Sequence, residues 1–128
     1  MLTREGVIPL LLEACPDLQP IWDTYYATNY TSGLRTERSY HSDILPIIKF
    51  LFERARDQET ACFPALFAVI ERLLNEGDER VADLVVIGIL EGVQNLAINR
   101  GLGHAVFLPW LGPETREHWL GLIDYWDS

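Results

Sequence analysis

The chain has 128 residues, of which 48% are hydrophobic and four are Trp. A chain of this length and composition folds as one domain and buries roughly two thirds of its unfolded surface, which excludes an intrinsically disordered protein. The net charge is -9, from 19 acidic residues against 10 Lys and Arg. Because this charge repels a phosphate backbone, the composition argues against direct nucleic-acid binding and favours a basic protein partner.

The beginning of the chain predicts two short helices. Apolar residues at 7–12 favour a first helix that Thr3 can cap and that Pro16 would end. Asp17 is a suitable N-cap for a second helix, whose apolar positions continue to about Tyr26.

A polar segment separates these two helices from the next one. Residues 28–40 are rich in Thr and Ser, and we expect them to form the longest loop of the chain. Apolar residues then recur at helical spacing over 44–52 and predict a third helix. His41, Ser42 and Asp43 stand at the start of that helix, and we assign them capping roles.

The clearest pattern is an antiparallel helical hairpin at 61–98. Pro64 fits the first turn of its first helix. Gly77 and Asp78 fit a tight turn in which the glycine ends one helix and the aspartate caps the next. The second helix is apolar over most of its length, so we expect it to be buried.

The end of the chain predicts one more helix after a short apolar connection at 104–111. We place Trp119, Leu120 and Trp126 on the inner face of this last helix. The patterns together predict an all-α fold of about six helices in one compact domain, residues 1–128. Helical repeats stack hairpins of this kind, and HEAT-like packing is one arrangement open to the central hairpin.

No group of residues matches a strong catalytic, cofactor-binding or metal-binding motif. Cys15 and Cys62 have no metal or redox spacing, and both lie in apolar stretches typical of reduced, buried thiols. A disulfide between them is the alternative that the sequence leaves open. His118 follows Glu114 by one turn, but a zinc site needs three or four ligands and such helical pairs are common on surfaces. We predict a protein that is not an enzyme and that holds neither a cofactor nor a metal ion.

Three polar residues interrupt the apolar second helix of the hairpin. Glu91, Gln94 and Asn95 cluster there at helical spacing. One interpretation is a buried hydrogen-bond network that fixes helix packing, and the other is a recognition face. The sequence leaves both open.

Acidic residues gather around the predicted hairpin turn, where Glu71 joins four others. A helix N-terminus favours some of these charges by itself, but an acidic surface also attracts a basic partner. Aromatic residues are the usual anchors of protein interfaces. The residues that we predict to contact a partner are Glu76, Asp78, Glu79, Asp83, Tyr30 and Trp110.

Three segments carry a resemblance to a known family. They are CPDLQPIWD (15–23), FPALFAVIERLLNEGDERVADLVVIGILEGVQNL (63–96) and LGPETREHWLGLIDYW (111–126). They resemble a family of small, acidic, helical bacterial proteins that are mostly uncharacterised. Members of that family are encoded beside polymorphic toxins, and the family resembles one used for toxin immunity. The region 28–60 has no counterpart in the resemblance.

The resemblance implies an immunity protein of a contact-dependent inhibition or toxin–antitoxin type. Such a protein binds its cognate toxin domain one-to-one in the bacterial cytoplasm and covers the active site or the substrate entrance. Many such toxins are nucleases with a basic cleft, which an acidic surface would fit. The alternative is a helical adaptor or a subunit of a larger assembly. A third hypothesis is an unrecognised enzyme, which would need a cleft that gathers Glu91, His118 or Cys62. No signal peptide is visible and Glu91 soon interrupts the most apolar run, so we expect no membrane segment.

Overall fold

Helices make up 77% of the chain in the computed structural model, which describes residues 1–127, and no strand forms among those residues. The predicted all-α class is confirmed, with seven helices in one domain. They are α1 (Val7–Ala14), α2 (Leu18–Tyr26), α3 (Tyr40–Asp43), α4 (Leu45–Arg56), α5 (Phe63–Glu76), one long helix and α8 (Pro113–Asp127). The long helix joins α6 (Glu79–Asp83), a π-helical segment (Leu84–Leu90) and α7 (Glu91–Asn99).

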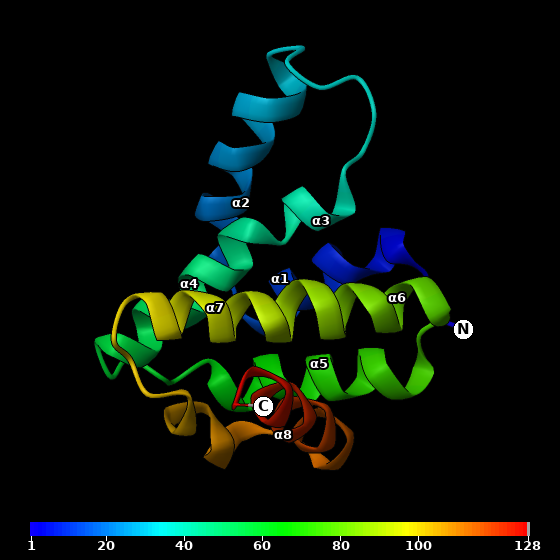
Figure 1. The fold of residues 1–128 in the computed structure, drawn as a ribbon. Coiled ribbons are helices and arrows are strands. Elements are labelled where there is room, and N and C mark those ends of the chain that lie inside the picture. The colour runs from blue at the N-terminus through cyan, green and yellow to red at the C-terminus, as the bar shows by residue number, and fades with distance from the viewer. Residues whose placement is uncertain (128) are drawn as a thin grey trace.

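The predicted hairpin is confirmed and forms the centre of the molecule. Helix α5 and the long helix lie side by side and run in opposite directions (Figure 1). The side chain of Asp78 accepts a 2.9 Å hydrogen bond from the backbone N–H of Val81 and thereby caps α6. A Cβ atom at Gly77 would collide with the Leu73 carbonyl oxygen and with Val81, so only glycine fits the turn.

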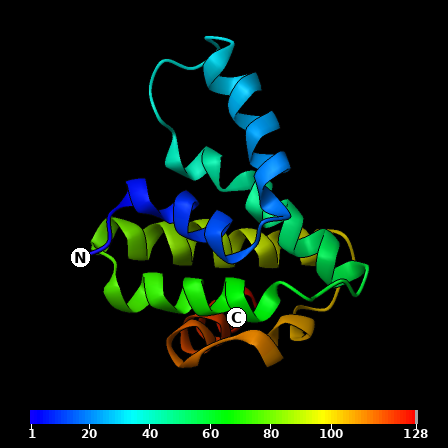
Figure 2. The same cartoon turned by 180° about the vertical axis from the view of Figure 1, so that it is seen from behind.

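The core lies on both sides of this hairpin. Helices α1 and α4 cover one side, and α8 covers the other together with the 3-10 helix η4 (His104–Trp110) (Figures 1 and 2). The ring centroid of Phe63 lies 5.4 Å from that of Phe67 and 6.3 Å from that of Phe107. The centroids of Phe107 and Trp119 are 5.5 Å apart. All four side chains are almost fully buried, and each such burial stabilises the fold by about 1.5–3 kcal/mol.

Helix α4 packs closely against the long helix through two glycines. Gly88 and Gly92 stand four residues apart on one face and receive Ile44 and Ile48. A Cβ atom at Gly92 would lie 2.5 Å from the Ile48 Cδ1 atom, so a larger residue there requires the Ile48 side chain to move.

The long helix, Glu79–Asn99, has 21 residues and could cross a membrane by length and composition alone, although the sequence predicts no membrane segment. Its most apolar window is 44% buried inside the domain, where it packs against α4, α5 and α8. A core helix of a soluble protein meets the same criterion, so this is weak evidence for a membrane segment.

The predicted loop at 28–40 is shorter than expected. Helix α2 continues into the π-helical segment Ala27–Thr31, and only residues 32–39 are irregular. The helix extends because the same polar residues that suggest a loop bond to the helical backbone. The hydroxyls of Thr28 and Ser32 donate to the carbonyl oxygens four residues earlier, at 2.9 and 2.5 Å, and so follow the helical turn.

The residues predicted to cap α2 and the third helix make no side-chain cap hydrogen bond. Asp17 has helical backbone angles (φ -61°, ψ -21°), so its side chain makes no cap hydrogen bond and instead faces Arg54 at 3.5 Å. The predicted third helix at 44–52 is α4, whose N-cap position is Ile44, so neither His41 nor Ser42 caps it. Both lie within α3, where Ser39 occupies the N-cap position and its hydroxyl donates to that of Ser42 at 2.9 Å.

The last helix agrees with the prediction in part. Trp119 is fully buried, but Leu120 is 40% exposed because the next residue of a helix points about 100° away. The side chain of Trp126 lies outside the described part of the structure. The predicted connection at 104–111 is mostly the 3-10 helix η4.

Candidate protein-interaction site

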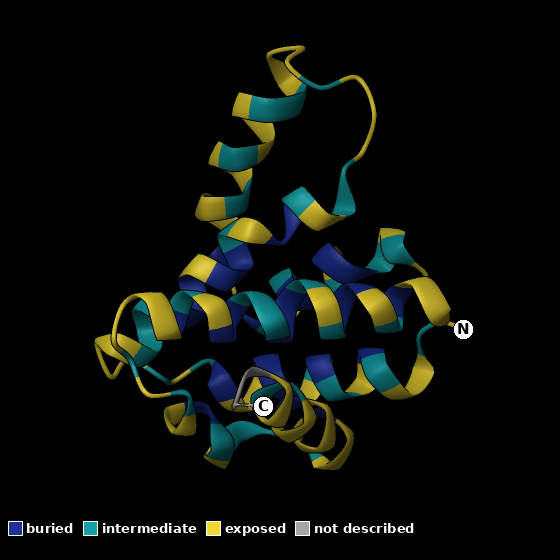
Figure 3. Ribbon diagram, viewed as in Figure 1, coloured by how far each residue is buried: buried dark blue, intermediate teal, exposed yellow. Residues whose placement is uncertain are grey.

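One part of the chain projects from the body of the molecule. Helix α2, its π-helical extension and the connection 32–39 form an arm, residues 18–39, that stands away from the hairpin (Figure 1). Leu18 is the only buried residue of the arm, and the rest is exposed or half-buried (Figure 3). The chain reverses at Gly33, whose φ of 83° glycine adopts without strain. The arm therefore presents surface rather than core.

A buried carboxylate holds the root of the arm. Asp43, at the end of α3, is 0% exposed. Its Oδ1 atom accepts hydrogen bonds from the hydroxyls of Tyr25 at 3.0 Å and Tyr30 at 2.5 Å. Its Oδ2 atom accepts from Nε and Nη2 of Arg38, at 3.0 and 2.8 Å. The predicted capping role of Asp43 is thus wrong: its side chain points into the arm, where it binds Tyr25 and Tyr30 on the helical part and Arg38 on the returning connection.

Both oxygens of this buried carboxylate are paired, which is what allows it to be buried. Burial and the neighbouring Asp43 carboxylate raise the pKa of Tyr25 to about 12, so the phenol remains a neutral donor at physiological pH. Arg35 donates to the same phenolic oxygen at 3.2 Å. The network is therefore both charged and well satisfied, and it fixes the arm in one orientation.

Aromatic rings cover one side of the arm. Trp22, Tyr26 and Tyr30 stand at successive turns, with ring centroids 6.0 Å apart for the first pair and 5.0 Å for the second. The guanidinium of Arg38 lies 5.5 Å from the Tyr30 ring and 5.0 Å from the Tyr40 ring. Packed but half-exposed aromatic residues of this kind serve as anchors in protein interfaces.

A groove of about 450 Å³ lies between this aromatic surface and α1. The residues that line it are Glu5, Ile8, Pro9, Leu12, Glu13, Gln19, Trp22, Tyr26 and Arg38. Two carboxylates outnumber the one cation of this groove, Arg38, whose guanidinium lies 6.0 Å from the Trp22 ring. The carboxylates and the remaining ring surface suit a cationic side chain of a partner, which can bind by charge and by cation–π contact. Hydrogen bonds from its own backbone N–H and from Thr3 hold the pKa of Glu5 below its ordinary value, so Glu5 is negatively charged at neutral pH.

The acidic residues predicted to bind a partner lie at the hairpin turn, far from the arm (Figure 1). Glu79 and Asp83 are exposed there. Glu76 pairs with Arg72 at 3.0 Å, and the Asp78 carboxylate is used as the cap of α6. Two of the four charges are thus partly occupied by local structure.

The two predicted aromatic anchors lie apart from each other and from the acidic residues. Tyr30 belongs to the arm, and its hydroxyl is turned inward to Asp43. Trp110 ends η4 beneath the body, where its half-buried ring packs edge-on against Phe63 at 5.8 Å. The structure does not bring the six predicted residues into one surface. Glu5, Glu13, Trp22 and Tyr26, which line the groove beside the arm, are not among those six.

Glu71 is not part of an acidic surface, although the sequence groups it with the turn. Its carboxylate accepts hydrogen bonds from the backbone N–H groups of Glu114 at 3.1 Å and Thr115 at 2.8 Å. The hydroxyl of Thr115 also donates to it at 2.8 Å. Glu71 therefore caps α8 from the neighbouring helix α5. Desolvation by itself would raise the pKa of Glu71, but these hydrogen bonds outweigh it and lower the pKa below the ordinary 4.5.

We expect Glu71→Ala to lower the free energy of unfolding by about 1–2 kcal/mol, because α8 loses its cap. A carboxyl group whose pKa is lower in the folded state stabilises that state above its unfolded pKa. This contribution disappears as the pH falls through the folded pKa, so the variant and the wild type should converge in strong acid. Urea unfolding across this pH range measures the difference, with exposed Glu79→Ala as the matched control. An equal loss in both variants would contradict the capping role.

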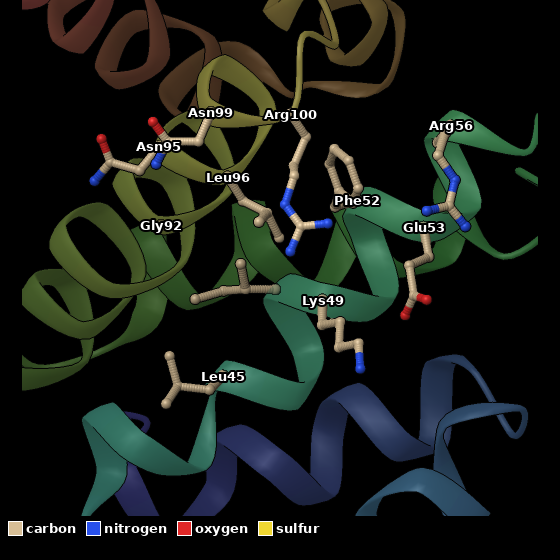
Figure 4. A pocket seen from close by; sticks show the side chains of 11 residues that line it. Leu45, Lys49, Phe52, Glu53, Arg56, Gly92, Asn95, Leu96, Asn99 and Arg100 are labelled. Carbon is tan, nitrogen blue, oxygen red and sulfur yellow. The ribbon is translucent and has the colours of Figure 1, made fainter.

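A second groove, of about 400 Å³, lies between α4 and α7. Figure 4 shows Arg100 reaching from the end of α7 towards Phe52 on α4, with Lys49 along the edge. Asn95 lines this groove and is exposed, whereas Gln94 is buried and donates to the Trp119 carbonyl oxygen at 3.0 Å. The polar residues at 91–95 therefore have different roles. Gln94 links two helices in the core, whereas Asn95 faces solvent.

The comparisons with known proteins place the chain in a family without assigning it a role. A family model described as a domain of unknown function, DUF7674, matches residues 8–127, and the chain belongs to this family. No curated protein matches the chain. No solved structure matches it either.

Proposed function

We propose that this member of the DUF7674 family is a protein-binding module of the immunity type, which neutralises a cognate bacterial toxin domain by covering its active site or substrate entrance. The observation that carries the proposal is the arm. It combines an aromatic surface, a rigid root at Asp43 and a neighbouring groove lined by Glu5 and Glu13, on a chain with a net charge of -9.

The arm would act as the contact element. A projecting element can enter a cleft that a flat surface cannot cover, and the ring surface of Trp22 and Tyr26 would anchor it there. The carboxylates of Glu5 and Glu13 would pair with Lys or Arg side chains of the toxin. Because the arm is held before binding, little conformational entropy would be lost on association.

The negative charge would act at longer range. The exposed Glu79 and Asp83 at the hairpin turn would contribute to steering a basic toxin towards the protein. A nuclease domain with a basic cleft is the partner class that fits best. The complex would be one-to-one and would form in the bacterial cytoplasm, with no nucleic acid bound directly.

A helical adaptor is the second candidate function. The groove between α4 and α7 favours it, because an apolar floor with Lys49 and Arg100 at its edge offers a docking surface away from the arm. An adaptor would retain its partner when the arm is altered, and its expression would not relieve toxicity.

The experiment is co-expression with the C-terminal domain of a toxin encoded immediately upstream. We expect the wild-type protein to co-purify with that domain, and the double variant Trp22→Ala/Tyr26→Ala to lose affinity by about 100-fold, since interface aromatics contribute most of the binding energy. The matched control is Ile87→Ala, which alters an apolar residue of the long helix that is 56% exposed and lies outside the arm. Equal binding of both variants would place the interface elsewhere.

A further inference from the structure

Two thiols and a carboxylate converge beside the root of the arm. Cys15 stands at the C-cap position of α1, Asp17 at the N-cap position of α2 and Cys62 at the N-cap position of α5. Their ligand atoms all lie within 4.8 Å of one another. The sequence did not reveal this group because its cysteines belong to different helices and are far apart in the chain.

We propose that Cys15, Asp17 and Cys62 form a binding site for a thiophilic metal ion of the zinc class, with water at the fourth position. Both cysteines are free thiols, and soft sulfur ligands select ions such as Zn²⁺. This assigns a metal site to a chain whose residue spacing predicts none.

The geometry requires only a small adjustment. A tetrahedral zinc ion with Zn–S bonds of about 2.3 Å holds its ligand atoms about 3.8 Å apart. Atoms within 4.8 Å of one another therefore have to approach by about 1 Å at most. Cys15 is fully buried and fixed, whereas Asp17 is exposed and free to rotate.

The surroundings allow Asp17 to turn towards the ion. Its only ion pair is with Arg54, at the long distance of 3.5 Å, among the described residues. Arg54 also contacts Glu59 at 3.6 Å, so the guanidinium keeps a charged partner when Asp17 leaves it. Cys62 is half-buried, which gives the ion and its water a path to the site.

A disulfide between Cys15 and Cys62 is the competing use of these thiols. It would form with loss of two protons and two electrons to an oxidant such as a low-molecular-weight disulfide. A disulfide has no use for a third donor, whereas the carboxylate of Asp17 completes a metal-ligand set. Burial and the neighbouring Cys62 raise the pKa of the Cys15 thiol to about 12, so a bound ion has to displace this proton. The metal site is the use that engages all three groups.

A bound ion would join the α1–α2 turn to the start of α5. Since the arm begins at α2, the ion would stiffen the arm where it leaves the body. Binding to the folded state alone would also raise the thermal unfolding temperature as the metal concentration increases.

The test uses the full-length protein, reduced and stripped with a chelator, and Cd²⁺ as the spectroscopic probe. We expect one equivalent to bind, with an ultraviolet thiolate-to-Cd²⁺ charge-transfer band, and Zn²⁺ to displace it. Cys62→Ser should weaken binding by about 100-fold or more, and Asp17→Asn by about 10-fold, since each removes one of three ligands.

The matched control is Asp23→Asn, which removes an exposed carboxylate from α2 and should leave binding unchanged. Asp17 is exposed, so its variant remains folded and informative even if the cysteine variant does not fold. Absence of the charge-transfer band would overturn the proposal. So would equal affinity of wild type and Asp17→Asn, or a Cys15–Cys62 disulfide in protein purified without reductant. None of these outcomes depends on a toxin partner.

Discussion

Replacement of Asp43 by alanine should lower the free energy of unfolding by about 2–4 kcal/mol. The carboxylate is fully buried and accepts four hydrogen bonds, two of them from Arg38. Without it, two half-buried phenols and the guanidinium of Arg38 lose their acceptor. Because the Arg38 side chain is 39% exposed, water replaces that acceptor in part. Urea-induced unfolding followed by far-ultraviolet circular dichroism measures the change.

The control for this change is Asp23→Ala on the same arm. That carboxylate is exposed and accepts one hydrogen bond, from Gln19, so we expect a loss below about 0.5 kcal/mol. Asp43→Ala should also increase amide hydrogen exchange in the arm more than in the hairpin. A stability within about 1 kcal/mol of wild type would show that the network does not hold the arm.

Replacement of Trp119 by alanine should also cost about 3–5 kcal/mol, because it leaves a large cavity beneath the hairpin. The side chain is fully buried, and its ring packs at 5.5 Å from Phe107. Its backbone carbonyl accepts the buried Gln94 amide, so the cavity would also disturb that hydrogen bond. Thermal and urea unfolding both report the loss.

Trp119→Phe is the matched control because it keeps most of the ring. The indole Nε1 atom has no hydrogen-bond partner among the described residues, so phenylalanine loses volume without breaking a hydrogen bond. We expect this variant to retain at least half of the stability that alanine loses. Equal losses in the two variants would mean that the cavity is not the cause.

Local signals explain why the hairpin could be predicted from the sequence. Pro64, Gly77 and Asp78 each act within one turn of their own position, and the apolar spacing between them is long and regular. The same reasoning places Trp119 inside and predicts the all-α class. Such features depend on short-range geometry, which a single sequence contains.

The arm could not be predicted in the same way. Asp43 bonds Tyr25 and Tyr30, which lie 18 and 13 positions earlier, and no local pattern links these residues. The helical extension at Ala27–Thr31 uses the same polar residues that usually mark a loop. The sequence contains one signal for the buried carboxylate. Asp43 stands directly before the apolar run at 44–52, where burial of the chain begins.

The roles of the acidic residues and the cysteines also could not be predicted from local sequence patterns. Glu71 and Asp78 have the composition of a charged surface, yet each is a helix cap in the structure. Cys15 and Cys62 have no motif spacing, yet they meet at the base of the arm. Charge and spacing identify the ionisable and thiol side chains, but only the fold determines which of them remain available to a partner.

The most direct test of the account is growth of bacteria that express the upstream toxin domain together with this protein. We predict full growth with the wild type and with Ile87→Ala, and growth arrest with Trp22→Ala/Tyr26→Ala at equal protein levels. Arrest with the wild type, or growth with the arm variant equal to that of the wild type, would contradict neutralisation through the arm.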